Sequence, residues 1–212
     1  MNSIFDSASR LAIKEVAFPD GKKFLSAPTL IEADLALCDK QIIHPIKEAS
    51  VMLKEVTGDI LLSTAGAIAH GIAPHDNFKQ GLALSLREQW PGMYKDFRHY
   101  CQTYNPKTGG AWSWKGPNSP VIINLFTQEP PPSDQDRPGK ATLPNVNHAL
   151  QALKKELQAH QVKSVALPRL ATGVGGLEWE KVYPLLQQVL KDLNIPVYVY
   201  GMYKKGVAAQ EA

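Results

Sequence analysis

The stretch RLATGVGGLEW, residues 169–179, places Gly173, Gly175 and Gly176 within four positions. Before it, VKSVALP has the composition of a buried strand, and after it WEKVYPLLQQVLKDLN has the pattern of a helix. Glycine in an ordered loop costs conformational entropy, so this loop should need something that only glycine allows. Two interpretations stay open, a tight strand-to-helix turn or a backbone that approaches a phosphate closely.

The same order of strand and helix recurs on both sides of the glycine loop. Strands that alternate with helices predict a three-layer α/β/α fold, in which helices cover both faces of a mixed central sheet. Short apolar runs predict strands at 51–57, 65–73, 121–126, 162–168 and 195–203. Helical periodicity, with Pro91 at a first turn, predicts helices at 81–90, 91–104, 145–160 and 179–194.

The first 48 residues follow a different pattern and are expected to be an N-terminal extension packed on a main domain of residues 49–212. LAIKEVAFPDGKKFL, residues 11–25, predicts two short strands around an Asp20-Gly21 turn. TLIEADLALCDKQI, residues 29–42, predicts a short helix that begins at Thr29.

Length and composition are those of a soluble globular protein. The chain has 212 residues, 44% of them hydrophobic and 20% charged, which suits one domain with an appendage. The net charge of +3 is too small to argue for nucleic acid, and the basic residues form no block. We find neither a signal peptide nor a membrane span, and we expect a cytoplasmic location, two reduced thiols at Cys38 and Cys101, and no cofactor or metal.

Two further segments carry polar side chains at expected strand ends. AHGIAPHDNFKQGLA, residues 69–83, follows one strand into a helix and holds His70, His75, Asp76 and Lys79. TGD, residues 57–59, ends another strand. Asp59 is interpreted either as the cap of the following turn or as a ligand group. The glycine loop itself has neither the spacing of a dinucleotide fingerprint nor that of a Walker loop.

The order of these pieces resembles the macro domain. The resemblance covers residues 51 to about 203, and its most telling segments are GLALSLREQWPGMYKDFRHYC (81–101) and LPRLATGVGGLEWEKV (167–182). It is nearest to the class that contains terminal ADP-ribose glycohydrolase and the fungal ADP-ribose-1″-phosphate phosphatases. The resemblance implies that the chain binds ADP-ribose, a derivative of it or an ADP-ribosylated macromolecule.

Residue by residue, the resemblance implies a site. Asp59, with Ile60 beside it, would bind the adenine, and the first loop, including Lys79, Gln80 and Gly81, would line the distal ribose. Thr127 would edge the pocket. The cradle for the diphosphate would be formed by Leu170, Ala171, Thr172, Gly173, Val174, Gly175 and Gly176.

The same resemblance leaves the chemistry open. The glycohydrolase aspartate is replaced by Gly175, and Lys115 matches the glycohydrolase lysine only with a shift of about one residue. His70 fits the phosphatase branch as a proton-transfer group, because a histidine pKa near neutrality suits acid–base work. His75 and Asp76 are interpreted as a base and its orienting partner. We therefore expect a hydrolase of ADP-ribose-1″-phosphate or of an ADP-ribosyl ester; the alternatives are a non-catalytic ADP-ribose-binding module and a fold relative with another nucleotide ligand.

Overall fold

The computed structural model describes residues 15–17, 23–25, 52–133 and 136–211. Contacts along the chain divide it into two units, residues 1–46 and 47–212. In the first unit β1 (Glu15–Ala17) and β2 (Lys23–Leu25) pair antiparallel, which confirms the two predicted strands. The helix predicted at 29–42 lies outside the described residues, as does Cys38, and the packing of residues 1–48 on the main domain stays a prediction.

The second unit is built on a six-stranded sheet with the order β3-β8-β7-β4-β6-β5. Every pairing is parallel except that of β5 with β6, so the sheet is mixed, as the sequence predicts. The strands are β3 (Leu53–Gly58), β4 (Ala67–Ile72), β5 (Ala111–Trp114), β6 (Val121–Phe126), β7 (Val165–Pro168) and β8 (Val197–Tyr203).

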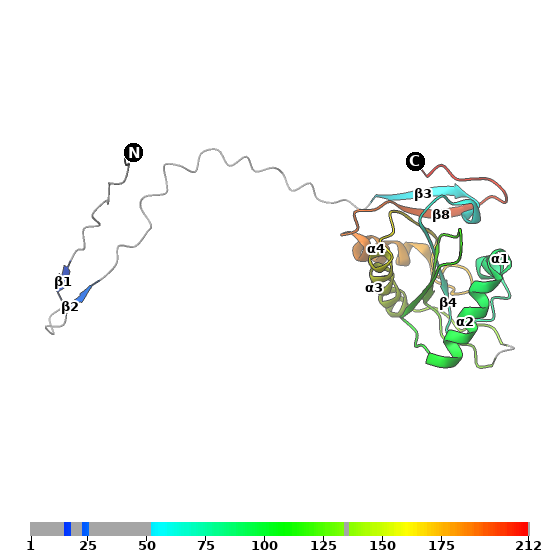
Figure 1. Ribbon diagram of the computed structural model, residues 1–212, viewed down its shortest axis with the longest axis horizontal. Coiled ribbons are helices and arrows are strands. Elements are labelled where there is room, and N and C mark those ends of the chain that lie inside the picture. The colour runs from blue at the N-terminus through cyan, green and yellow to red at the C-terminus, as the bar shows by residue number, and fades with distance from the viewer. Residues whose placement is uncertain (1–14, 18–22, 26–51, 134–135, 212) are drawn as a thin grey trace, which may run out of the picture. The chain divides into compact units, whose positions relative to one another are not determined.

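Helices cover both faces of this sheet, which confirms the three-layer α/β/α fold (Figure 1). One pair packs on one face and the second pair packs on the other, and a short 3-10 helix, η1, follows β3. The bounds are η1 (Ile60–Leu62), α1 (Gly81–Gln89), α2 (Pro91–Tyr104), α3 (Leu143–Ala159) and α4 (Trp179–Leu190).

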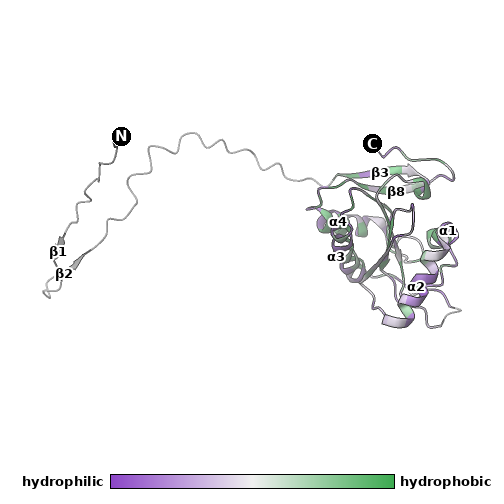
Figure 2. Ribbon diagram, in the orientation of Figure 1, coloured by the Kyte–Doolittle hydropathy of each residue, from purple (hydrophilic) through white to green (hydrophobic). Residues whose placement is uncertain are grey.

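The central strands are buried along almost their whole length because both of their faces are covered. All six residues of β6 are buried, and β4 is buried except at Gly71. The α3–α4 side forms one apolar cluster, with Leu150 and Leu186 among its members, and the α1–α2 side forms another around Phe78 and Phe97. Much of α2 is coloured hydrophilic in Figure 2. Only Met93, Phe97 and Cys101 of this helix are buried, and its other residues reach solvent.

Strand β5 is the one element of the sheet that the sequence did not predict. Its four residues are half-buried, and they pair antiparallel with β6 at the edge of the sheet. Trp112 packs against Phe97 and Tyr100, whereas the Trp114 indole N–H donates to Asp96 on α2 at 2.9 Å. A short segment of aromatic and small residues gives no clear period, so tertiary contacts decide that it is a strand.

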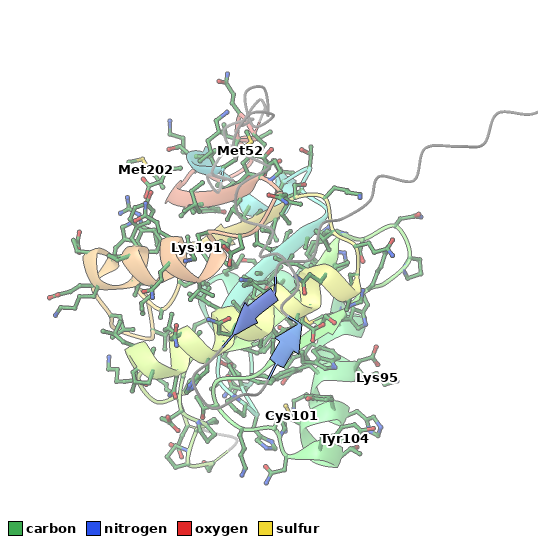
Figure 3. All side chains as sticks on the ribbon, turned by 90° about the vertical axis from the view of Figure 1, so that its left-hand side faces the viewer. Met52, Lys95, Cys101, Tyr104, Lys191 and Met202 are labelled. Atoms are coloured by element: carbon green, nitrogen blue, oxygen red, sulfur yellow. The ribbon has the colours of Figure 1, made fainter. Side chains whose placement is uncertain are left out.

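In the described residues, no helix combines the length and the apolar character that crossing a bilayer requires. Cys101 is a free, buried thiol within the α1–α2 cluster. Figure 3 shows Lys95 and Tyr104 on α2 toward one end of the domain and Met202, on β8, toward the other.

We predict that Phe97→Ala lowers the free energy of unfolding by about 3–5 kcal/mol, because a fully buried ring leaves a cavity between α2 and the sheet. Lys95→Ala, on the exposed part of the same helix, should change it by no more than about 0.5 kcal/mol. Equilibrium unfolding in urea measures both. Equal effects of the two variants would contradict this account of the core.

Candidate functional site

A cavity of about 490 Å³ lies where β4 and β7 end. Gly71 and Ile72 of β4 and Pro168 of β7 contribute to its wall, because the carboxyl ends of parallel strands meet at one edge of the sheet. A second cavity of about 360 Å³ adjoins it and shares five lining residues with it. The shared residues are Gly81, Leu82, Pro168, Tyr200 and Tyr203.

The three glycines of the loop after β7 have three different surroundings. Gly176 has φ +73°, which favours glycine, and a Cβ at Gly175 would lie 2.6 Å from the Ala171 carbonyl oxygen. A Cβ at Gly173 would meet nothing within 4 Å. The loop therefore needs Gly175 and Gly176 for its own packing and turn, whereas Gly173 borders open space in the larger cavity.

The glycine loop also carries backbone donors without acceptors. Gly176 N–H bonds the Gly173 carbonyl at 3.1 Å, and Leu177 N–H bonds the Ala171 carbonyl at 3.0 Å. Among the described residues, the N–H groups of Gly173, Val174 and Gly175 find no acceptor, and all three residues line the larger cavity. Successive free N–H groups beside a helix N-terminus favour an anion.

His70 is held deep in the wall of the larger cavity. It pairs with Asn124 across β4 and β6, and its Nε2 donates to Asn124 Oδ1 at 2.8 Å. This tautomer follows from the other end of the amide, where Asn124 Nδ2 donates to the Trp112 carbonyl at 3.3 Å. Burial lowers the pKa of His70 to about 4, against the smaller opposite effect of the Asn124 hydrogen bond.

The expected near-neutral pKa of His70 is therefore wrong. A buried imidazolium would lose its hydration without gaining a counter-charge, so the ring stays neutral at pH 7 and has no proton to give as a general acid. The sequence shows the strand-end histidine, but it does not show that the ring packs against Phe78 and bonds an amide.

Asp76 lines the same cavity, but its predicted partner does not. The Asp76 carboxylate accepts from Phe78 N–H at 2.8 Å, and burial raises its pKa above the ordinary value despite backbone hydrogen bonds from Phe78 and Ala73. His75, at φ 58°, instead bonds Asn105 Oδ1 through Nε2 at 3.0 Å, at the end of α2. The two side chains bond different groups, so the structure shows no hydrogen bond between His75 and Asp76, and their interpretation as a base and its orienting partner stays a prediction.

Asp59 is the cap of the turn that follows β3, and it also lines a cavity. It caps η1, with Oδ1 accepting from Leu61 N–H at 3.2 Å, and with Ile60 it lines the smaller cavity. Its Oδ2 accepts from Gly206 N–H at 3.0 Å. The carboxylate is thus oriented by the backbone on two sides.

The structure does not bring every predicted residue to the cavities. Lys115 follows Trp114, which pairs with Ile122 near the start of β6, whereas the cavity lies beyond the other end of that strand. The structure therefore does not bring Lys115 to the cavities, because antiparallel β5 carries it to the opposite end of the neighbouring strand, and its catalytic role stays a prediction. Lys79 is exposed, and Leu170, Gly176 and Thr127 lie outside both cavity walls. Residues that do line the larger cavity include Gln80, Gly81, Ala171, Thr172, Gly173, Val174 and Gly175.

Four lining residues escape the sequence reasoning. Arg169 lies beside Glu55 at 3.4 Å and directly follows β7, so its position after a parallel strand is a signal that could have found it. Gln128 is buried and its Oε1 has no partner among the described residues. Tyr200 lies in the middle of β8 and Tyr203 at its end, and the pattern of this strand does not show that both side chains line the cavities.

Comparison with known proteins assigns the fold to a family. The family model described as "Macro domain" matches residues 76–186, which include the second part of the first loop and the whole glycine loop. The chain belongs to the macro domain family. In the described part of this macro domain, no cluster of three His, Cys, Asp or Glu side chains is arranged to hold a metal ion.

Curated relatives of this macro domain include proteins that are named DNA ADP-ribosyl glycohydrolase. A Thermus aquaticus protein named DNA ADP-ribosyl glycohydrolase is 27% identical over 152 residues, covering 70% of this chain and 41% of that protein. A Thermosipho africanus fusion of DNA ADP-ribosyl transferase and DNA ADP-ribosyl glycohydrolase is 24% identical over 170 residues, covering 73% and 43%. The chain thus spans about two fifths of the length of these relatives.

Solved structures of relatives have the same fold. The macrodomain of Thermus aquaticus DarG superposes with a TM-score of 0.63 at 26% identity, covering 72% of this chain and 99% of that one. Thermosipho africanus DarTG, in complex with ADP-ribose, superposes with a TM-score of 0.62 at 22% identity, covering 76% and 43%.

We predict that His70 makes stability fall as the pH drops from about 6.5 to about 4. In this window the unfolded histidine binds a proton that the folded one, with its lowered pKa, does not. The loss totals about 3 kcal/mol at 1.36 kcal/mol per pKa unit, and it ends below pH 4. His70→Gln should remove this component of the pH dependence, whereas His148→Gln, on the exposed part of α3, should keep it. Urea unfolding from pH 4 to 8 measures the difference, and parallel profiles for the two variants would contradict the prediction.

Proposed function

We propose that this macro domain binds ADP-ribose across the two adjoining cavities and hydrolyses a bond at C1″ of its distal ribose. The observation that carries the proposal is the row of unpaired N–H groups at Gly173, Val174 and Gly175 in the wall of the larger cavity, which the smaller cavity adjoins. A diphosphate needs such donors, and a nucleotide on one side with a sugar on the other fills the remaining space.

The smaller cavity suits the adenine. The Asp59 carboxylate can accept from the exocyclic amine, and Ile60 and Leu61 provide an apolar floor. Tyr203 is 66% exposed and lines both cavities, so its ring is available to stack on a base. This orientation places the distal ribose in the larger cavity, which Asp76, Gln80 and His70 line.

Asp76 is the proposed proton-transfer group. Its raised pKa makes it a stronger base than an exposed aspartate, and the Phe78 N–H fixes one oxygen. In the proposed reaction water attacks C1″, the bond from C1″ to the leaving group breaks, and Asp76 takes one proton from the attacking water. The leaving group takes a proton from solvent, and Asp76 returns its proton to solvent, which regenerates the carboxylate. The products are ADP-ribose and the free leaving group.

The names of the relatives support a glycosidic bond to DNA as the bond that is cleaved. An ester to a protein and a 1″-phosphate are the other leaving groups that the same cleft can admit. A DNA substrate would make an ADP-ribosylated nucleic acid the partner of this domain, and a protein ester would make it an ADP-ribosylated protein.

A second function, a module that binds ADP-ribose without cleaving it, is favoured by the neutral, amide-bonded His70 and by the glycine at position 175. Neither residue can supply a proton at pH 7. This leaves Asp76 as the ionisable carboxylate in the larger cavity. The effect of substituting Asp76 on turnover therefore distinguishes the two functions.

We predict that Gly173→Val abolishes ADP-ribose binding and leaves the melting temperature nearly unchanged. The added side chain enters open space in the cavity, where it blocks the ligand without meeting the protein. Gly175→Val should instead lower the melting temperature by several degrees, because its Cβ would collide with the Ala171 carbonyl and the Ala141 side chain. Calorimetric titration and thermal melting of both variants measure this contrast. Tight binding by a folded Gly173→Val protein would refute the cradle.

We predict that Asp76→Asn lowers kcat at least about a hundredfold while ADP-ribose affinity stays within a few-fold. The amide oxygen can still accept from Phe78 N–H, so the turn is kept and only the base is lost. The acid limb of the wild-type pH–rate profile should reflect a pKa above that of an ordinary aspartate. Release of ADP-ribose from an ADP-ribosylated oligonucleotide, an ADP-ribosyl-glutamate peptide and ADP-ribose-1″-phosphate is measured.

Asp192→Asn, on the surface after α4, is the matched control and should keep full activity. Turnover of none of the three substrates by a wild-type protein that binds ADP-ribose would leave the binding module as the function. Full activity of Asp76→Asn would retain the enzyme and exclude Asp76 as its base.

A further inference from the structure

The segment that follows β8, residues 204–211, turns back over the β3–β8 edge of the sheet, and we name it the strap (Figure 1). Lys204 N–H bonds the Gly58 carbonyl at 3.1 Å, and the Val207 carbonyl accepts from Asp59 N–H at 2.7 Å. The approach is close enough that a Cβ on Gly58 would lie 2.8 Å from the Val207 carbonyl oxygen. The strap is thus fitted against the end of β3 where Asp59 lies.

Glu211 fastens the far end of the strap. Its Oε1 accepts from Ser63 Oγ at 2.6 Å and from Tyr200 Oη at 2.8 Å, and its Oε2 accepts from Thr64 N–H at 2.8 Å and from Thr64 Oγ1 at 2.7 Å. The residue is 8% exposed. Burial alone raises the pKa of Glu211, but the hydrogen-bond donors together lower it by more, so the net shift of the pKa is downward. An ionised carboxylate with four donors is a fixed anchor.

Both ends of the strap act on groups of the candidate site. Gly206 N–H donates to Asp59 Oδ2, so the strap orients the carboxylate assigned to the adenine. Glu211 bonds the hydroxyl of Tyr200, whose side chain is buried and lines both cavities. One acidic side chain far along the sequence therefore connects η1, β8 and the smaller cavity.

We propose that Glu211 is a positioning residue for base recognition, which acts through the strap to hold Asp59 in the orientation that accepts the adenine amine. The proposal rests on the proposed function of Asp59. Without the anchor, the strap loses the four hydrogen bonds of Glu211 and keeps only its bonds to Gly58 and Asp59, so the Gly206 N–H holds Asp59 Oδ2 less firmly. Affinity for the amine then falls, whereas contacts to the diphosphate at the glycine loop are unaffected.

The decisive measurement is base discrimination, not affinity alone. Dissociation constants are measured by calorimetry for ADP-ribose and for the analogue whose adenine is replaced by hypoxanthine, which lacks the exocyclic amine. The wild-type protein should prefer ADP-ribose by roughly tenfold, and Asp59→Ala should reduce that ratio to near one. Glu211→Ala should reduce the ratio by about fivefold.

Three further variants sharpen the test. Gln210→Ala, exposed and next to Glu211, is the matched control and should keep the wild-type ratio. Glu211→Gln keeps an acceptor for the two hydroxyls but faces one donor group toward Thr64, so it should give an intermediate ratio. Thr64→Val removes a single bond to the anchor and serves if Glu211→Ala does not fold.

The outcomes separate the two proposals. A ratio lost in Asp59→Ala and kept in Glu211→Ala, or in Thr64→Val if that variant is needed, overturns the positioning role and leaves the Asp59 assignment intact. Equal weakening of both ligands by Glu211→Ala marks a merely structural anchor and also overturns it. A wild-type ratio near one removes the assignment of Asp59 to the adenine, and the role of Glu211 falls with it.

Discussion

The pairing of β4 with both β7 and β6 is the constraint on which the rest of the structure depends. These three strands are parallel and buried on both faces. Their register is fixed because a shift would move apolar side chains out of the positions in which they pack. That register sets His70 opposite Asn124 and brings the ends of β4 and β7 to one edge. The cavity follows from this geometry, because the loops that leave the strands must diverge there to reach helices on opposite faces.

Burial has opposite chemical consequences for His70 and Asp76, which both line the larger cavity. It keeps His70 neutral by lowering its pKa, and it raises the pKa of Asp76. An imidazole locked between Asn124 and Phe78 is a structural element of the wall, whereas a carboxylate with a raised pKa is equipped to take a proton. Because of desolvation, the proposed proton transfer is assigned to Asp76 and not to His70, the residue that the family resemblance favours.

Much of the fold could be predicted, because the long strands and helices carry their own periodicity. Residues 121–126 were predicted as a strand and form β6, and Pro91 begins α2 as its fixed φ predicts. Strand β5 could not be predicted, since it is an edge strand whose aromatic residues pack against α2 rather than in a repeating pattern. Without β5 the sequence could not show that Lys115 turns away from the cavity.

The sequence by itself determined the alternation of strands and helices, the glycine loop after β7 and the presence of Asp59 at the end of β3, because each depends on neighbours a few residues away. Only the tertiary structure decided which glycine borders the cavity, which histidine is neutral, and that Glu211 fastens a strap beside Asp59. These properties depend on burial and on contacts between residues up to 148 positions apart. No local pattern encodes them, because desolvation and close packing exist only after the chain has folded.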